Sequence, residues 1–552
     1  MKKIFSLLLI LLATFPTFAH VGSSGVLLQG QAGPYRVLVN VQPPDVIPGT
    51  AKVTVFVENG GANQVQARPI YFRSGDEGAP TYDDIPAVAG QLGQFDGIVW
   101  LMEWGSSSVQ VVIDGDKGKG ELVIPIVAVS TAERDMPVEL GIGLGLLGLL
   151  LVLLLVTVIG ASVSDGLLRP GQHLTPQQKR KRWINMGIAT VVCGVVLYTG
   201  SSWWDSWAAD YRQWIYKPLK AKTQVAIEDG QRVFSLQVDT TNWKNQRRGN
   251  MLSYLVPDHG KLMHLFLVRV PGLDAFAHLH PERRDSTTFQ AYLPKLPAGK
   301  YLVYADVVQY SGFAETIMDT VEIPALPRAE VLALKKTDDE DTYVVTAPLN
   351  NAKKVPLDEN VVICGLPGTR TQLTDGSYVV WEGTAGRAFE AGKPYQLSFE
   401  VFDPDGKPAT LEPYLGMPGH AAIVRSDGSV YIHLHPTGTY VMAAEQSLTG
   451  RIADTARTYK RPVPAVFRDS IDRYLASLKT MPAAEREKYL MQQMGMTTAT
   501  ASTHTGMEHG HRISFPYAFP KEGQYRIFLQ IKRNGQVITS VFDARVTDST
   551  TL

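Results

Sequence analysis

The sequence predicts a mainly β protein in which several immunoglobulin-like β-sandwich domains are combined with two transmembrane helices. Short stretches of alternating apolar and polar residues, separated by glycine and proline, run through most of the 552 residues. This pattern is typical of half-buried strands. Two uncharged apolar segments are each long enough to cross a bilayer. One series of strands and motifs also occurs twice in the second half of the chain, which indicates a duplicated domain.

Residues 1–19 are typical of a secretory signal peptide. Two lysines precede the apolar run 4–13, and Thr17, Phe18 and Ala19 provide a small-residue cleavage site. The run is short for a retained membrane anchor. Cleavage after Ala19 would make His20 the first residue, and its amino group and imidazole could then chelate copper together. His20 is therefore a weaker metal candidate.

Residues 20–135 are expected to form an N-terminal β-sandwich. Strand-like alternation is clear at 35–41, 51–57, 109–113 and 122–127, and no helical period of useful length occurs. Strands of this length, separated by glycine and proline, are typical of a small immunoglobulin-like domain.

Two membrane spans are predicted at residues 140–163 and 183–204, joined by a cytoplasmic loop at 164–182. The loop carries five basic residues against one acid, so the positive-inside rule places it in the cytoplasm. The regions on either side of the two spans then face the periplasm. We expect a bacterial inner-membrane protein with two spans and both termini periplasmic after signal cleavage.

Two periplasmic repeats are predicted at 223–324 and 375–547, with a linker or extra strands at 325–374. Residues 395–401 parallel 234–238, and 519–526 parallel 296–302. The second repeat is interrupted by an insertion at 437–512, which contains a predicted helix at 466–496 and a stretch rich in methionine and histidine.

Each repeat contains the motif His-Leu-His-Pro, at residues 278–281 and 433–436. Alternate side chains of a strand share a face, so both imidazoles of each motif point to one side. A histidine with a nearby methionine stands 14 residues before the first motif and 13 before the second. The predicted metal ligands are His264, His278, His280 and Met263 in the first repeat, and His420, His433, His435 and Met417 in the second. The alternative is that these histidines only end a strand.

Copper is the expected metal, because thioethers favour Cu(I), while zinc remains an alternative that imidazole also suits. His259 is a weaker candidate for the first site, since it lies shortly before Met263 and His264. The insertion adds weaker candidates in a stretch that could collect copper or could be a flexible loop without ligands. They are Met494, Met496, His504, Met507, His509 and His511.

An outward-facing sandwich with His20 at its mature terminus resembles the CopC and YtkA-like periplasmic copper domains. Its position before a membrane span also resembles FixH-like proteins of oxidase assembly. The resemblance covers architecture and the His and Met motifs. The sequence departs from CopC because there is no histidine between His20 and His173. A copper site formed by the amino group and imidazole of His20, known as a histidine brace, would therefore lack its usual third nitrogen. Met102 or Glu103 could contribute a ligand in its place. The resemblance implies a copper-handling role near a membrane oxidase.

We expect a membrane-anchored periplasmic copper-binding protein that handles copper, confers tolerance or delivers copper to a membrane cuproenzyme. Its expected partners are the membrane and a cuproenzyme or copper transporter. The zero net charge gives no indication of nucleic-acid binding. The alternatives are a copper-dependent oxidoreductase that uses the same sites and a metal-free periplasmic scaffold. Binding is favoured over catalysis because no Ser-His-Asp order and no paired acids are recognisable.

Overall fold

The computed structural model describes residues 20–21, 25–133, 136–164, 168–169, 171–241, 251–334, 338–349, 369–382, 388–454, 459–493 and 510–548. The chain forms two compact units. One combines the chain up to Ala128 with the chain from Lys217 onward, and the other is Val129–Tyr216. Six β-sheets are found in the described residues, which confirms the mainly β fold class.

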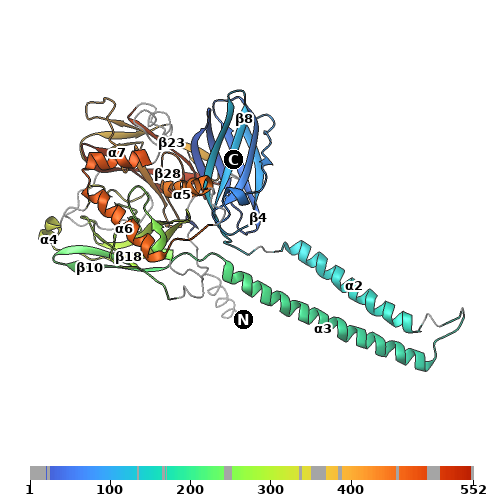
Figure 1. Cartoon of the computed structure of the whole chain (residues 1–552). Helices are drawn as coiled ribbons and strands as arrows, with labels where there is room; N and C mark the ends of the chain where they lie inside the picture. The colour runs from blue at the N-terminus through green and yellow to red at the C-terminus, as the bar shows by residue number, and fades with distance from the viewer. Residues whose placement is uncertain are drawn as a thin grey trace. The chain divides into compact units, whose positions relative to one another are not determined.

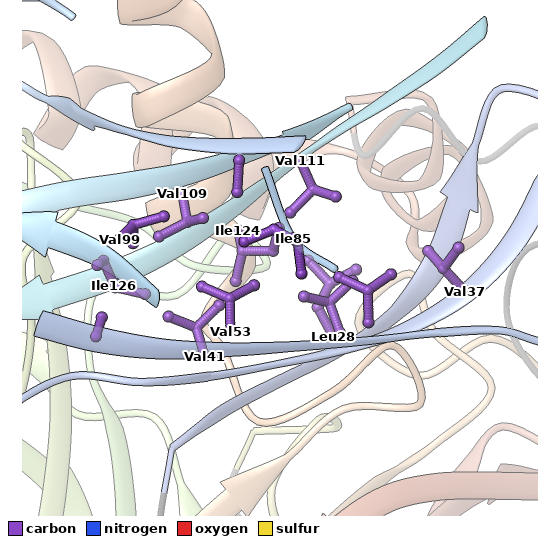
Figure 2. Close-up of a cluster of buried hydrophobic side chains, with 14 of the residues drawn as sticks. Leu28, Val37, Val41, Val53, Ile85, Val99, Val109, Val111, Ile124 and Ile126 are labelled. Atoms are coloured by element: carbon purple, nitrogen blue, oxygen red, sulfur yellow. The ribbon is translucent and has the colours of Figure 1, made fainter. Parts of the chain in front are cut away.

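The N-terminal region forms two four-stranded sheets packed around one core. The first sheet has the order β2(Val26–Ala32), β3(Tyr35–Gln42), β4(Gly49–Val57) and β7(Gln94–Leu101). The second has the order β6(Asp83–Asp84), β5(Ala62–Tyr71), β8(Gly105–Gly115) and β9(Gly118–Ala128), with a 3-10 turn η1 at Asp76–Gly78. Alternate valines and isoleucines of both sheets point into the core, among them Val53, Val99, Val109 and Ile124 (Figure 2). This inward alternation is what the period of two in the sequence predicts.

The first repeat is built from a small sheet and a large sheet. The small sheet has the order β10(Ala221–Glu228), β11(Gln231–Val238), β16(Thr288–Tyr292) and β15(Glu282–Arg283). The large sheet has the order β12(Leu255–Val256), β17(Gly299–Gln309), β13(His264–Arg269), β14(Ala275–Leu279) and β19(Thr342–Val345), with β18(Ala314–Ile323) also paired to β17. Two short helical segments, η3(Met251–Tyr254) and α4(Arg328–Ala333), accompany these sheets.

The second repeat has the same arrangement of its main strands. One sheet has the order β20(Arg370–Gln372), β21(Tyr378–Trp381), β23(Pro394–Phe402) and β26(Arg512–Ala518). The other has the order β25(Val430–Leu434), β24(His420–Arg425), β27(Gly523–Arg533), β28(Gln536–Thr547) and β22(Phe389–Glu390). The short strand β1(His20–Val21) lies parallel to β25 at the edge of this sheet, with His20 paired to Val430.

The insertion contains three helices in its described residues: α5(Met442–Ala453), α6(Pro464–Thr480) and α7(Ala483–Gln493). The single helix predicted over 466–496 is therefore wrong, because it is broken between Thr480 and Ala483. The break coincides with Pro482, and a residue before proline is disfavoured in helical conformation.

The unit Val129–Tyr216 contains two helices that are long and apolar enough to span a membrane, α2(Val138–Ser164) and α3(Pro176–Trp214) (Figure 1). They lie side by side, with Gly160 of α2 against Met186 of α3. The helix α3 begins before the predicted span, because Thr175 caps it in a reciprocal hydrogen-bonded box with Gln178. Lys179–Arg182, predicted in the loop, therefore lie in the first turns of α3.

Candidate metal centre

The large sheets of the two repeats pack against each other through their outer faces. On β13, Leu265 and Leu267 point into the core of the first repeat, while Phe266 and Val268 point toward the second repeat. On β24, Ala422 and Val424 point toward the first repeat in the same way. These side chains form an apolar layer between the repeats. His264 at the start of β13 and His420 at the start of β24 lie on the strand faces that point toward this layer.

Each repeat contributes three buried imidazoles beside this layer: His264, His278 and His280 from the first, and His420, His433 and His435 from the second. The ring centroids of the first set are separated by 5.3, 4.6 and 5.1 Å. The corresponding distances in the second set are 5.3, 4.6 and 5.2 Å. The two His-Leu-His motifs and their upstream histidines therefore form the same arrangement twice.

The register of the strands explains why each upstream histidine meets its motif. In the first repeat Leu265 pairs with Leu279 and Phe266 with His278, so the strand ends bring His264 beside the motif. In the second repeat Ala421 pairs with Leu434 in the same register. The upstream histidine lies 14 residues before the motif in the first repeat and 13 in the second, because the hairpin of the second repeat is one residue shorter.

The two sets, which the sequence predicted as one site in each repeat, lie against each other. The His433 ring lies 5.3 Å from the His264 ring and 5.5 Å from the His278 ring. His259, from the turn before β13, reaches across to the second repeat, where its ring lies 4.9 Å from His435. Seven imidazoles thus form one histidine cluster between the repeats.

Two groups within the histidine cluster have nitrogen atoms that all lie within 4.8 Å of one another. Site A consists of His264, His278 and His280, and site B of His259, His420 and His435. Site A has the three histidines predicted for the first repeat. Site B contains His259, which the sequence assigned to the first site, in place of His433. His259 lies in a turn with a positive φ of 50°, and its ring lies 5.3 Å from His420 and 4.9 Å from His435 of the second repeat.

Hydrogen bonds fix which nitrogen of each site A imidazole carries a lone pair. His264 Nε2 lies 3.1 Å from the Asp258 carbonyl oxygen and donates to it, which leaves the lone pair on Nδ1. His278 Nδ1 lies 2.6 Å from Gln530 Oε1 and donates to it, which leaves the lone pair on Nε2. These two lone-pair nitrogens are only 3.1 Å apart. A cation between them would satisfy both.

His280 completes site A. Its Nδ1 lies 2.8 Å from Asp341 Oδ1, and its Nε2 is buried without a hydrogen-bond partner among the described residues. A carboxylate on the far nitrogen is the usual orienting partner of a metal-ligating histidine. Burial, followed by the charge of Asp338, raises the pKa of Asp341 to about 8. A cation at His280 Nε2 would favour the ionised carboxylate.

Site B shows the same chemistry. His435 Nδ1 lies 2.9 Å from the Tyr440 carbonyl oxygen and donates to it, so its Nε2 carries a lone pair directed at His259 Nε2, 3.2 Å away. Both nitrogens of His420 are buried without a hydrogen-bond partner in the described part of the chain. Buried polar atoms are normally paired, so these nitrogens fit a ligand role better than a packing role.

The histidine cluster is electrically neutral near pH 7. Burial lowers the pKa of every imidazole in it: to about 3 for His259, to about 4 for His264 and His435, and well below 6.5 for the other four. A neutral imidazole is the form that binds a metal ion, so no proton has to be displaced at neutral pH.

Two polar residues in equivalent positions connect the repeats at the histidine cluster. Asp306 pairs with His264 across β17 and β13, and Gln530 pairs with His420 across β27 and β24. Each reaches the motif of the other repeat: Gln530 accepts from His278, and Asp306 lies 3.8 Å from His433 Nδ1. The sequence reasoning missed both residues, although an alignment of the two repeats places them at matching positions.

The remaining predicted ligands lie elsewhere. Met263 packs in the hydrophobic core of the first repeat and Met417 in the core of the N-terminal sandwich. His511 lies beside Glu400 and Phe402, with 3.9 Å between His511 Nε2 and Glu400 Oε1. The weaker candidates Met494, Met496, His504, Met507 and His509 lie outside the described residues.

A family model described as a domain of unknown function (DUF8832) matches residues 372–460 and 490–548. The matched segments include the histidines of the second repeat and leave out residues 461–489, which contain α6 and most of α7. No curated protein sequence matches the chain.

Three solved structures show weak similarity. Dimeric latent PorU from Porphyromonas gingivalis is 8% identical, with 91% of this chain and 32% of that chain covered and a TM-score of 0.13. The BSP domain of a biofilm-associated protein is 9% identical, with 98% and 68% covered and a TM-score of 0.13. The titin domains z1z2 in complex with telethonin are 8% identical, with 60% and 95% covered and a TM-score of 0.10. The chain thus spans about a third of the PorU chain, and these TM-scores support no common fold.

Proposed function

We propose that this chain is a membrane-anchored periplasmic protein that binds a transition metal, with copper as the expected ion and zinc as the alternative. The observation that carries the proposal is the convergence of lone-pair nitrogens in a buried cluster of seven histidines. The far nitrogens of His264, His278 and His435 are held by acceptors, and that of His280 by Asp341. Imidazole ligands suit copper and zinc better than magnesium or calcium.

The sequence and the two apolar helices support the proposed membrane anchor and compartment. The two apolar helices α2 and α3 are long enough to hold the protein in a membrane. The signal-like start and the basic residues between the two spans support a periplasmic position for the β domains. A metal centre placed close to a membrane suits copper handling, tolerance or delivery to a membrane cuproenzyme or transporter.

Elemental analysis of the detergent-purified full chain tests metal binding. We expect copper or zinc to copurify or to be bound after loading with Cu(I) or Zn(II). The double variant His278→Ala/His420→Ala, which removes one ligand from each site, should lose this metal, whereas His511→Ala, a histidine outside the cluster, should retain it. A chain that gains neither metal under reducing or oxidising conditions would be a scaffold.

The choice between copper and zinc depends on the donor atoms. The two predicted thioethers pack in hydrophobic cores, so the described ligand set consists of imidazoles, which suit both metals. A competition titration in reducing buffer distinguishes the two metals, and tighter binding of Cu(I) would support copper. Tighter binding of Zn(II) would replace copper by zinc in this proposal.

A copper-dependent oxidoreductase is the second candidate. It is favoured by site A, where three protein nitrogens would leave a coordination position open, as in catalytic metal sites. The burial of all seven imidazoles weighs against it, because a substrate would need access. Oxygen consumption by the copper-loaded chain with a reductant would favour the enzyme, and its absence would favour binding alone.

A further inference from the structure

Sites A and B lie close together. Their nearest rings, those of His264 and His259, have centroids 6.1 Å apart. His433 lies at the boundary, 5.3 Å from both His264 and His420 and 4.6 Å from His435. Its Nε2 is buried without a hydrogen-bond partner among the residues that the structure describes. This nitrogen can therefore take part in either site.

Each site is completed by the opposite repeat. Site B takes His259 from the first repeat, and site A depends on Gln530 of the second repeat to orient His278. Asp306 of the first repeat lies beside His433 of the second. The two sites are therefore interlocked parts of one structure.

Three carboxyl groups that are buried or mostly buried lie beside histidines of the cluster. Asp341 contacts His280, Asp258 Oδ2 lies 3.4 Å from His259 Nε2, and Asp306 lies near His433. Neutral imidazoles alone would leave the charge of two cations uncompensated among buried side chains. Three carboxylates distributed over both sites provide that compensation.

We infer that sites A and B form a dinuclear centre that holds two transition-metal ions, with His433 between them. This inference rests on the proposed function and adds the number of ions and their proximity. Two-metal sites in other proteins hold their ions roughly 3.5–4 Å apart. The pairing of the repeats makes such a centre, because neither repeat alone supplies both sites.

The test loads the full chain in detergent with Cu(II), a paramagnetic ion that imidazole binds well. We expect two copper ions per chain and an electron paramagnetic resonance spectrum of a coupled pair. His259→Asn, which keeps a residue that tolerates positive φ, should bind one ion with an uncoupled spectrum. His280→Ala should do the same by removing the ion of site A. His511→Ala should keep the coupled pair.

The wild-type result decides the inference whether or not each variant folds. One copper ion per chain, or two ions with independent spectra, would overturn the dinuclear centre while leaving metal binding intact. No copper in the wild-type chain, together with none after loading with Cu(I) or Zn(II), would overturn the proposed function itself. The failures of the two proposals are therefore distinguishable.

Discussion

Four nitrogen atoms of the histidine cluster are buried without a hydrogen-bond partner within the described part of the chain: Nε2 of His280, Nε2 of His433 and both nitrogens of His420. Each such atom costs about 1–3 kcal/mol of desolvation free energy when it remains unpaired. A protein that needed these side chains only for packing would be more stable with leucine there. Coordination of a metal ion would offset this cost.

Gln530 orients a ligand from a distance. Replacing it with alanine removes the closer acceptor of His278 Nδ1 and leaves only the Tyr414 hydroxyl at 3.2 Å, so this imidazole is held less firmly with Nε2 toward site A. We expect Gln530→Ala to weaken metal binding at site A about 10- to 100-fold, as for other orienting partners of metal ligands. A competition titration with a chelator of known affinity measures the change.

Gln536→Ala is the matched control for this variant. It removes the same side chain from an exposed position at the start of β28 in the same hairpin, and should leave affinity unchanged. Equal affinities of Gln530→Ala and the wild type would show that the hydrogen bond does not position His278.

At the scale of elements, the sequence predicted which side chains share a face and left open which faces meet. The alternation around His278 and His433 requires only the period of a strand, and the structure has the motif leucines Leu279 and Leu434 in the opposite, core layer. The contact between the two large sheets depends on tertiary packing of Phe266, Tyr431 and their neighbours, which no local pattern encodes. His259 was placed in the first site for the same reason, since sequence proximity does not show that its turn faces the second repeat.

The helices α6 and α7 cover one side of the histidine cluster. Leu478 of α6 and Leu490 of α7 lie over Gly260, the residue after His259. Glu487 of α7 accepts a hydrogen bond from the Gly416 amide at 2.8 Å. The insertion therefore packs on the segments that carry site B.

Weakening the packing of α6 and α7 on the segments that carry site B should speed the exchange of bound metal. Leu490 is 4% exposed, and Leu490→Ala removes a contact over the turn that holds His259. We expect a stability loss of about 2–5 kcal/mol and faster transfer of bound metal to a chelator. Stopped-flow or absorbance measurements of that transfer provide the readout.

Val466→Ala is the control on α6, where the side chain is 64% exposed and its loss should change neither property. An unchanged transfer rate in a folded Leu490→Ala protein would show that metal leaves the cluster by another route.

At the scale of the whole molecule, the histidine cluster makes the stability of the metal-free protein sensitive to acid. Seven imidazoles have a pKa below 6.5 in the folded protein because they are buried. Below pH 6.5 the unfolded chain binds protons that the folded protein does not, so the free energy of unfolding falls as the pH falls. This loss continues toward the folded pKa values of about 4 for His264 and about 3 for His259.

Buried carboxyl groups with a raised pKa increase the free energy of unfolding as the pH falls. Burial raises the pKa of Asp306 to about 6, of Glu445 to about 7 and of Asp341 to about 8, so the folded protein binds their protons first as the pH falls. Burial also raises the pKa of Asp274 and Glu487. The seven imidazoles outnumber these five carboxyls, so the net effect of acid on these groups is destabilising. Each excess proton bound by the unfolded chain contributes about 1.36 kcal/mol per pH unit.

Metal should therefore stabilise the full chain near neutral pH and cease to do so in acid. At a free metal concentration of about one hundred times Kd, binding to the folded state alone adds about 2.7 kcal/mol to the free energy of unfolding. Protons compete for the same nitrogens in the folded protein only as the pH approaches the folded pKa values, about 4 for His264 and about 3 for His259, so this gain should shrink between about pH 5 and about pH 3. Thermal unfolding followed by circular dichroism, with and without Zn(II) or Cu(I), measures both effects. His278→Ala/His420→Ala should show no metal-dependent rise in Tm, and a rise in the wild type that persists below about pH 3 would mean that the stabilising ion binds outside the imidazoles.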